Sequence, residues 1–176
     1  MKIITIYNND LLEPLLDKMA KLTTEGFGDS VELWRKRFAY WWKDNPYLTD
    51  DMPACWIISN DEMDEIFGFH ASIPILFQHG DKKLLAAGSG TFYVTPSARG
   101  ALSTALGIQP SRHKYVDVMI STTTNALSHK MICSMGYRRV GNMDTITNYM
   151  IIVCCRDFLS MISYLANHFM ISETGM

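Results

Sequence analysis

The chain has 176 residues, of which 48% are hydrophobic and 19% are charged, and its formal net charge is -2. This length and composition predict a soluble globular protein with a single domain over residues 1–176. The near-neutral charge excludes the broad basic field that nucleic acid needs, and no apolar run is long enough to span a membrane. Because MKIITIYNNDLL turns polar too soon for a signal peptide, we expect a cytoplasmic protein without nucleic-acid or membrane partners.

The N-terminal quarter predicts a strand followed by two helices. Apolar and polar residues alternate over 2–7, and the Asn8-Asn9-Asp10 cluster is a candidate cap for a helix in LLEPLLDKMAKL. A second helix is predicted in VELWRKRFAYWWKDN, ending before Pro46. Its large aromatic residues recur at helical spacing, which is more typical of a core face than of a binding platform. They are Trp34, Phe38, Trp41 and Trp42.

The remainder predicts mostly strands. A short strand over 55–59 precedes two long strand-like segments, EIFGFHASIPILFQ and KLLAAGSGTFYVT, which His79-Gly80-Asp81 joins as a hairpin. Pro74 inside the first segment indicates an edge, a bulge or a local splay. A strand over 115–122 follows, then a short helix that begins at Asn125 and ends at Gly136, then a hairpin of 137–140 with 145–154. An amphipathic helix is predicted in RDFLSMISYLANHF.

The four cysteines lie in apolar surroundings and lack the CxxC spacing of a zinc site. We expect buried, reduced thiols and no metal. The residues are Cys55, Cys133, Cys154 and Cys155.

This order of elements carries sequence motifs in matching places. VTPSARG ends the long central strand at 94–100, and NALS at 125–128 precedes MGY at 135–137. In the first half, WKDNP at 42–46 and GFHASIP at 68–74 match a W-x-x-N-P element and a G-F-x-x-x-I-P hairpin. Together they resemble the GNAT N-acetyltransferase superfamily, as a divergent member. The resemblance implies an α/β (α+β) fold of three layers, with a mixed, mostly antiparallel sheet splayed between strands 4 and 5 and helices on both faces.

The resemblance also implies acetyl-CoA as the acyl donor, with its pantetheine paired to the splayed strand. Gly88 and Gly90 are the positions where a bulge costs least. The helix start after Pro96 would hold the pyrophosphate, with Arg99 adding a full charge. The implied cofactor-binding residues are Phe92, Val94, Thr95, Arg99, Gly100, Ala101, Leu102, Ser103, Thr104, Asn125 and Ser128. Asn125 is equally consistent with a simple helix cap.

Two departures from the family pattern concern the chemistry. The pyrophosphate loop of relatives usually reads R-G-x-G-x-G/A, whereas this chain reads RGALST over 99–104, and Gly107 and Pro110 are expected to shorten the following helix. Where many relatives place a tyrosine that protonates the leaving thiolate, this chain has Ile132. The candidate catalytic groups near the centre are His70, Ser89 and Tyr93. A histidine on a sheet face is more often a satisfied core residue.

The resemblance therefore implies an acetyl-CoA-dependent N-acetyltransferase that moves the acetyl group directly to a primary amine, of a small molecule or a protein, in a ternary complex. A catalytically inactive binding or inhibitory protein of the same fold is the alternative, and a transferase of a longer acyl group is a further one. An acidic patch is consistent with attraction of a cationic amine or with ordinary solvated loops. It comprises Asp50, Asp51, Asp61, Glu62 and Asp64. Monomer and homodimer are both open.

Overall fold

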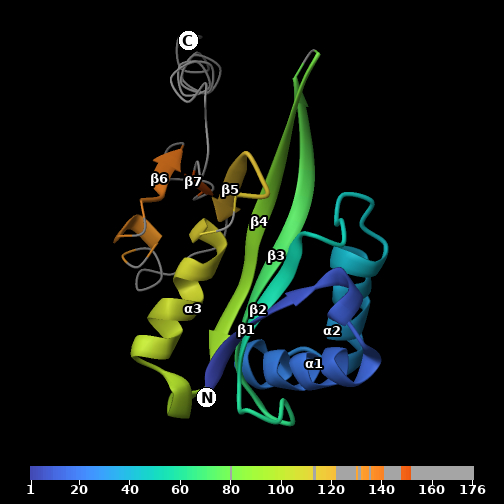
Figure 1. Cartoon of the computed structure of the whole chain (residues 1–176), viewed down its shortest axis with the longest axis vertical. Helices are drawn as coiled ribbons and strands as arrows, with labels where there is room; N and C mark the ends of the chain where they lie inside the picture. Colours follow the sequence, from blue (N-terminus) through green and yellow to red (C-terminus); the bar gives the residue numbers. More distant parts are fainter. Residues whose placement is uncertain are drawn as a thin grey trace, which may run out of the picture.

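The computed structural model describes residues 1–79, 81–112, 114–121, 130, 132–134, 136–140 and 148–151. Within these residues one seven-stranded sheet has the order β1-β2-β3-β4-β5-β7-β6 (Figure 1). Its strands are β1 (Lys2–Tyr7), β2 (Pro53–Ser59), β3 (Ile66–His79), β4 (Lys82–Val94), β5 (Val118–Ser121), β6 (Arg138–Val140) and β7 (Asn148–Ile151). The helices are α1 (Glu13–Phe27), α2 (Val31–Phe38) and α3 (Ala101–Arg112).

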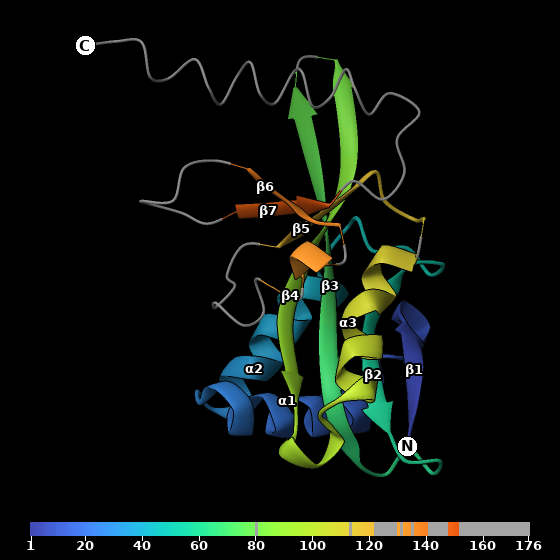
Figure 2. The same ribbon diagram turned by 90° about the vertical axis from the view of Figure 1, so that its left-hand side faces the viewer.

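The sheet is mixed, with helices on both faces. Neighbouring strands are antiparallel except β4 and β5, which are parallel. Helices α1 and α2 lie against one face and α3 against the other (Figures 1 and 2). The predicted three-layer fold is therefore confirmed. None of the described helices is long and apolar enough to cross a membrane.

The two faces bury different side chains. Beneath α1 and α2, Phe38 stacks on Trp42, with ring centroids 5.0 Å apart, and both meet the Phe69 ring of β3. Beneath α3, the buried side chains of Trp56 and Leu106 belong to a second apolar cluster. The aromatic residues of the second predicted helix thus form core, as their spacing indicates, with Trp41 half-buried beside them.

The start of the first helix and the end of the second differ from the predicted positions. The Asn8-Asn9-Asp10 cluster does not cap α1, because it forms a 3₁₀ turn of its own, η1 (Asn8–Asp10), in which an Asp10 carboxylate oxygen accepts from the Tyr7 N–H at 3.0 Å. Leu12 takes the cap position without a side-chain hydrogen bond. Helix α2 ends at Phe38, and the chain continues as a π-helical turn, η2 (Ala39–Lys43).

Two further expectations are wrong. Helix α3 is not shortened at Gly107 or Pro110 but runs through both to Arg112. Cys55 is buried as expected, and burial raises the pKa of its thiol, but Cys133 is exposed. Cys154 and Cys155 lie outside the described residues, as does the predicted C-terminal helix.

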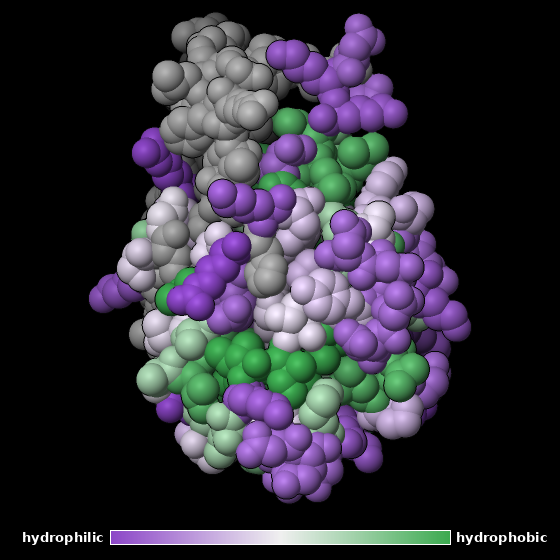
Figure 3. All heavy atoms as spheres, in the orientation of Figure 1, coloured by the Kyte–Doolittle hydropathy of each residue, from purple (hydrophilic) through white to green (hydrophobic). Residues whose placement is uncertain are grey.

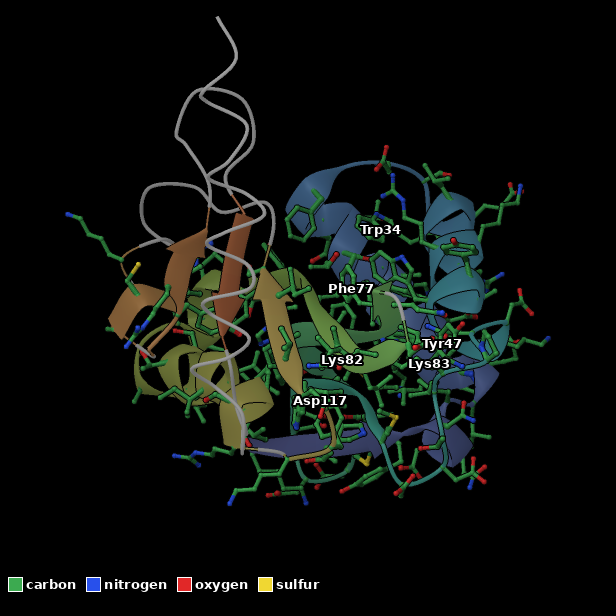
Figure 4. All side chains as sticks on the ribbon, turned by 90° about the horizontal axis from the view of Figure 1, so that it is seen from above. Trp34, Tyr47, Phe77, Lys82, Lys83 and Asp117 are labelled. Carbon is green, nitrogen blue, oxygen red and sulfur yellow. The ribbon has the colours of Figure 1, made fainter. Side chains whose placement is uncertain are left out.

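The β3–β4 hairpin is long and projects beyond the other strands (Figures 1 and 2). Its strands stay in register from Gly68 opposite Val94 to His79 opposite Lys82, apart from one shift. On the projecting part Ile75 and Phe77 remain 38% and 46% exposed, and Figure 3 shows hydrophobic surface there. Seen from above, Lys82 lies on the side of Asp117 and Lys83 on the side of Tyr47 (Figure 4), as strand alternation requires.

Candidate active site

The parallel strands β4 and β5 separate after a short contact. Only Ala86, Ala87 and Gly88 of β4 pair with β5, opposite Val118, Met119 and Ile120. From Ser89 to Val94, no described strand pairs with β4 on this side. We call this separation the splay and the Gly88–Ser89 position its apex. The predicted splay between strands 4 and 5 is thus confirmed for the described residues, and among them no strand pairs with the main-chain groups of β4 from Ser89 to Val94 on this side.

A β-bulge interrupts β4 inside the splay. His70 pairs with Phe92 and Ala71 with Gly90, so Thr91 is an extra residue in the ladder. Thr91 has a φ of 33°, a conformation that β-branched residues rarely adopt. The bulge therefore does not fall on a glycine. Gly90 instead allows close packing, because a Cβ there would lie 2.9 Å from Cδ1 of Ile73.

The start of α3 follows the end of β4 after a 3₁₀ turn, η3 (Pro96–Ala98). Gly100 precedes it with a φ of 106°, a conformation that glycine adopts without strain. The Ser103 hydroxyl accepts from the Gly100 N–H at 3.1 Å and donates to the Gly100 carbonyl at 2.8 Å. The Thr104 hydroxyl donates to the same carbonyl at 3.3 Å, and Arg99 Nε donates to the Val94 carbonyl at 3.3 Å. These polar groups hold the turn together.

Leu102, which replaces a family glycine, packs inward. Its side chain contacts the cluster of Trp56, Ile58, Val94, Ala98 and Leu106 beneath α3. The leucine therefore contributes to the core and does not stand across the helix start. In an α-helix the first N–H groups lack intrahelical partners, so those of the α3 first turn are oriented toward an incoming anion.

His70 and Ser89 lie together beneath α3. His70 is 4% exposed, and its Nε2 lies 2.7 Å from the Ser89 hydroxyl oxygen. Its Nδ1 lies 3.4 Å from the Leu106 carbonyl oxygen, which sets Nδ1–H as the donor and Nε2 as the acceptor. Burial lowers the pKa of His70 to about 4, although the Leu106 contact acts in the opposite direction. The imidazole is neutral at pH 7.

Pro110 explains why the Leu106 carbonyl is available to His70. In a regular helix that carbonyl accepts from the N–H four residues later, which is residue 110. Proline has no N–H, so the continuous helix leaves Leu106 without its usual donor. The His70 imidazole supplies the missing hydrogen bond from β3.

The half-buried Tyr115 contacts one of a pair of serines on neighbouring strands. Ser72 of β3 and Ser89 of β4 are opposite each other in the ladder. The Tyr115 hydroxyl lies 3.1 Å from the Ser72 hydroxyl. Burial raises the pKa of Tyr115, and it raises that of Tyr137, which lies just before β6, to about 12. Both phenols are protonated at neutral pH.

Tyr137 is a residue that the sequence motifs did not select. It lies just before β6 and is 5% exposed. Its N–H donates to the Ile132 carbonyl at 3.2 Å, so it is attached to the end of the helical segment that carries Ile132. The available signal was the MGY sequence itself, in which a glycine ends a helix and a tyrosine follows.

Tyr93 lies on the opposite face from His70. A Cβ on Gly26 of α1 would lie 2.5 Å from the Tyr93 ring, and the Phe27 ring centroid is 5.8 Å away. Phe92, by contrast, faces His70, with centroids 5.1 Å apart. The structure therefore brings His70 and Ser89 together and separates Tyr93 from them by the thickness of the sheet.

Two of the other predicted cofactor-binding residues are described by the structure, and two are not. Val94 is buried under α3 and Thr95 donates its N–H to the Phe67 carbonyl at 2.8 Å, while Asn125 and Ser128 lie outside the described residues. The acidic patch is made of exposed loop residues, of which Asp61 pairs with Lys2 of β1 at 3.4 Å. Among the described residues, no group of histidine, cysteine or acidic side chains has the arrangement of a metal site.

No protein-family model matches the sequence, and no curated protein matches it. Solved structures do share its architecture. A chain of the NatC complex bound to Gag peptide and CoA superposes with a TM-score of 0.62 at 15% identity, covering 88% of this chain and 100% of that one. A GNAT family acetyltransferase from Bacillus cereus ATCC 10987 gives 0.55 at 15% identity, with 88% and 98% covered.

A protein from Corynebacterium glutamicum ATCC 13032, described as histone acetyltransferase HPA2 and related acetyltransferase, gives a TM-score of 0.59 at 11% identity, with 89% and 98% covered. At identities this low, the superpositions establish the fold alone. The chain has the fold of the GNAT acetyltransferases, and the resemblance seen in its motifs is confirmed at that level.

Proposed function

We propose that the protein is an acetyl-CoA-dependent N-acetyltransferase, in which the acetyl group passes directly to a primary amine within a ternary complex. The observation that carries this proposal is the edge of β4 from Ser89 to Val94, with which no described strand pairs on the β5 side and which is followed by the turn η3 and the start of α3. In this fold a CoA donor would be held by a strand edge that pairs with pantetheine and by a cationic or N–H-rich position for pyrophosphate.

Both requirements have a physical counterpart here. Free main-chain groups on a strand edge bind an extended amide-containing chain as an added strand would, and pantetheine contains such amides. The first turn of α3 and the charge of Arg99 favour a pyrophosphate at the end of that edge. The CoA bound in the NatC structure supports a CoA donor for this fold.

The reaction needs no covalent intermediate on the enzyme. A deprotonated amine attacks the thioester carbonyl carbon, and a main-chain N–H on the open edge polarises the carbonyl oxygen. Alignment of the two reactants contributes on the order of 7 kcal/mol or more to lowering the barrier. The binding site therefore supplies much of the catalysis through orientation.

An inactive binding protein of the same fold is the second candidate, and one observation favours it. The hydroxyls of Ser103 and Thr104 and the N–H of Gly100 are satisfied within the turn. These groups are consequently not free to contact a phosphate. The two candidates differ in whether the α3 first turn binds CoA.

Calorimetric titration with acetyl-CoA and with CoA tests the proposal, using Ala101→Glu and Ala101→Gln variants. Ala101 is the first residue of α3 and is exposed. A glutamate at a helix start stabilises the helix but repels a pyrophosphate, so loss of binding is not attributable to unfolding. We expect micromolar binding by the native protein and by Ala101→Gln, and affinity at least about tenfold weaker for Ala101→Glu.

Absence of binding by the native protein would favour the inactive alternative. Equal affinity of all three proteins would show that the ligand binds away from α3. For a protein that binds, release of free thiol in the presence of a panel of small amines and peptides identifies the acceptor. Repeating the titration with longer acyl-CoA donors tests the third possibility.

A further inference from the structure

A cleft of about 550 Å³ is bordered by α1 and α2. Its walls are the turn η1, the start of α1, the end of α2 and the π-helical turn η2, and its lining includes no residue of β4 or α3. This volume is within the range of small-molecule binding sites. Neither the sequence motifs nor the proposed function accounts for the cleft.

The floor of the cleft is apolar and largely aromatic. Phe38 and Trp42, which are 1% and 2% exposed, stack with ring centroids 5.0 Å apart. The half-buried Leu11 and Leu16 pack against the same cluster and also line the cleft. The indole N–H of Trp42 already has its partner on β3, so the ring offers apolar surface to the cleft. An apolar body of a ligand is therefore favoured at the floor.

The π-helical turn η2 is a second feature of the cleft. The Asp44 N–H donates to the Ala39 carbonyl, five residues earlier, at 2.9 Å. Ala39, Trp42 and Lys43 of this turn line the cleft. Because π-helical turns are rare and occur frequently at functional sites, η2 marks the cleft as a binding site independently of its volume.

The rim of the cleft carries one acidic and one basic side chain without ion-pair partners. Arg35 pairs with Asp17, so its charge is balanced within the protein. Glu13 and Lys43 are exposed and line the same cleft, yet neither forms an ion pair with any described residue. Both charges are consequently available to groups of opposite charge on a ligand.

We propose that this cleft binds a free α-amino acid with a large apolar side chain. Such a molecule carries an ammonium and a carboxylate at one end and an apolar body at the other, which matches the charged rim and the apolar floor. The Glu13 carboxylate pairs with the ammonium of the ligand and Lys43 with its carboxylate, while the ligand side chain lies against Phe38 and Trp42. A purely cationic, purely anionic or uncharged ligand leaves at least one of the two rim charges without a partner.

The amino acid L-phenylalanine is the test ligand, and three analogues each lack one part of it. Glycine lacks the apolar body, 2-phenylethylamine lacks the carboxylate and 3-phenylpropanoate lacks the ammonium. Calorimetric titration of the full chain without CoA should give a dissociation constant of about 0.1–1 mM for L-phenylalanine. The two analogues with one charge should bind about three- to fivefold more weakly, as expected for loss of an exposed ion pair. Glycine should bind at least about tenfold more weakly.

Variants without the rim charges show which residue recognises which end of the ligand. Lys43→Met should weaken L-phenylalanine about three- to fivefold but should not weaken 2-phenylethylamine, because that analogue has no carboxylate. Glu13→Gln should weaken L-phenylalanine by a similar factor but should not weaken 3-phenylpropanoate. Lys21→Met and Glu25→Gln are matched controls, because both residues are exposed on α1 outside the cleft. These controls should bind L-phenylalanine as the native protein does.

Three results would overturn the inference. The first is the absence of L-phenylalanine binding up to about 10 mM. The second is binding that Lys43→Met and Glu13→Gln leave unchanged, because the ligand then lies outside the cleft. The third is equal weakening of L-phenylalanine and both one-charge analogues by each rim variant, which contradicts the pairing of charges.

The inference and the proposed function are tested separately. A protein that binds CoA but no L-phenylalanine contradicts the amino-acid site alone. A protein that binds L-phenylalanine through Glu13 and Lys43 but binds no CoA contradicts the transferase alone.

Discussion

The indole N–H of Trp42 donates to the carbonyl of Ser72 at 3.0 Å, which joins the π-helical turn η2 to the outer edge of β3. Two residues further along β3, the Pro74 carbonyl accepts from the Asn45 side chain at 2.9 Å. At this level of β3 no described strand occupies the outer edge, because β2 pairs only as far as Ala71. Trp42 and Asn45 therefore replace a neighbouring strand, and the WKDNP and GFHASIP motifs are the two halves of one contact.

Replacing Trp42 by phenylalanine should leave the Ser72 carbonyl unsatisfied in the interior. We expect Trp42→Phe to lower the free energy of unfolding by about 1–3 kcal/mol, measured by urea denaturation. Trp41→Phe is the matched control, because Trp41 is half-buried and its indole N–H has no hydrogen bond to the described residues. Equal losses for the two variants would show that ring size, and not the hydrogen bond, decides the effect.

Gly26 should not tolerate alanine while Tyr93 is present. The new methyl group would lie 2.5 Å from the ring, so the clash should cost about 1–3 kcal/mol, more than the roughly 1 kcal/mol that alanine contributes to a helix. In Tyr93→Ala the same Gly26→Ala change should become neutral or stabilising. Thermal unfolding of the native protein, the two single variants and the double variant measures the coupling between Gly26 and Tyr93. Additive effects would contradict the close contact.

Thr91 should accept glycine better than Thr95 does. The φ of 33° at Thr91 is unfavourable for a β-branched residue, so glycine relieves strain there and offsets its own entropic cost. Thr95 has a φ of -57°, so glycine relieves no strain there; it brings an entropic cost of about 0.5–1 kcal/mol and removes the exposed hydrogen bond between the Thr95 and Ser97 hydroxyls. We expect Thr91→Gly to be neutral or stabilising by up to about 1 kcal/mol in the same unfolding assay. The opposite ranking would argue against a strained bulge.

His70 should make the stability depend on pH in the acidic range. Its pKa is about 4 in the folded protein, below the ordinary value of 6.5, so the unfolded chain binds the proton first as pH falls. The contribution is fully present above about pH 6.5 and is lost as pH falls toward 4, with a magnitude on the order of 3 kcal/mol. Urea denaturation from pH 7 to 4 should show a shallower pH dependence for His70→Gln. Parallel profiles for the two proteins would mean that His70 does not cause the pH dependence of the stability.

Local patterns predicted most of the strands, because alternation and the hairpin residues around Gly80 depend only on neighbours in the chain. Pro110 shows where this reasoning fails. A proline ends a helix when it leaves a carbonyl without a donor, but here His70, 36 residues earlier than Leu106 in the chain, provides the donor. The bulge at Thr91 is likewise a feature of the pairing of β3 with β4, which the sequence of a single strand does not reveal.

For the candidate site too, local sequence predicted some residues, and tertiary contacts decided the others. His70 and Ser89 were both selected by residue type, and the 2.7 Å contact joins them, but alternation alone did not separate Tyr93 from them because the bulge changes which face each residue occupies. The burial of Tyr137 was missed because it depends on packing between segments that are distant in the chain. The cofactor contacts of Arg99 and the α3 start stay predictions.

The three residue pairs between β4 and β5 are the whole of the described backbone ladder between strands β1–β4 and strands β5–β7. Strand β2, in contrast, is buried at every residue and paired on both edges. Cooperative opening follows the weakest junction, so native-state hydrogen exchange should release the amides of β5 at a lower free energy than those of β2. The splay therefore also marks the boundary between two folding units, and occupation of it by a ligand would join them into one.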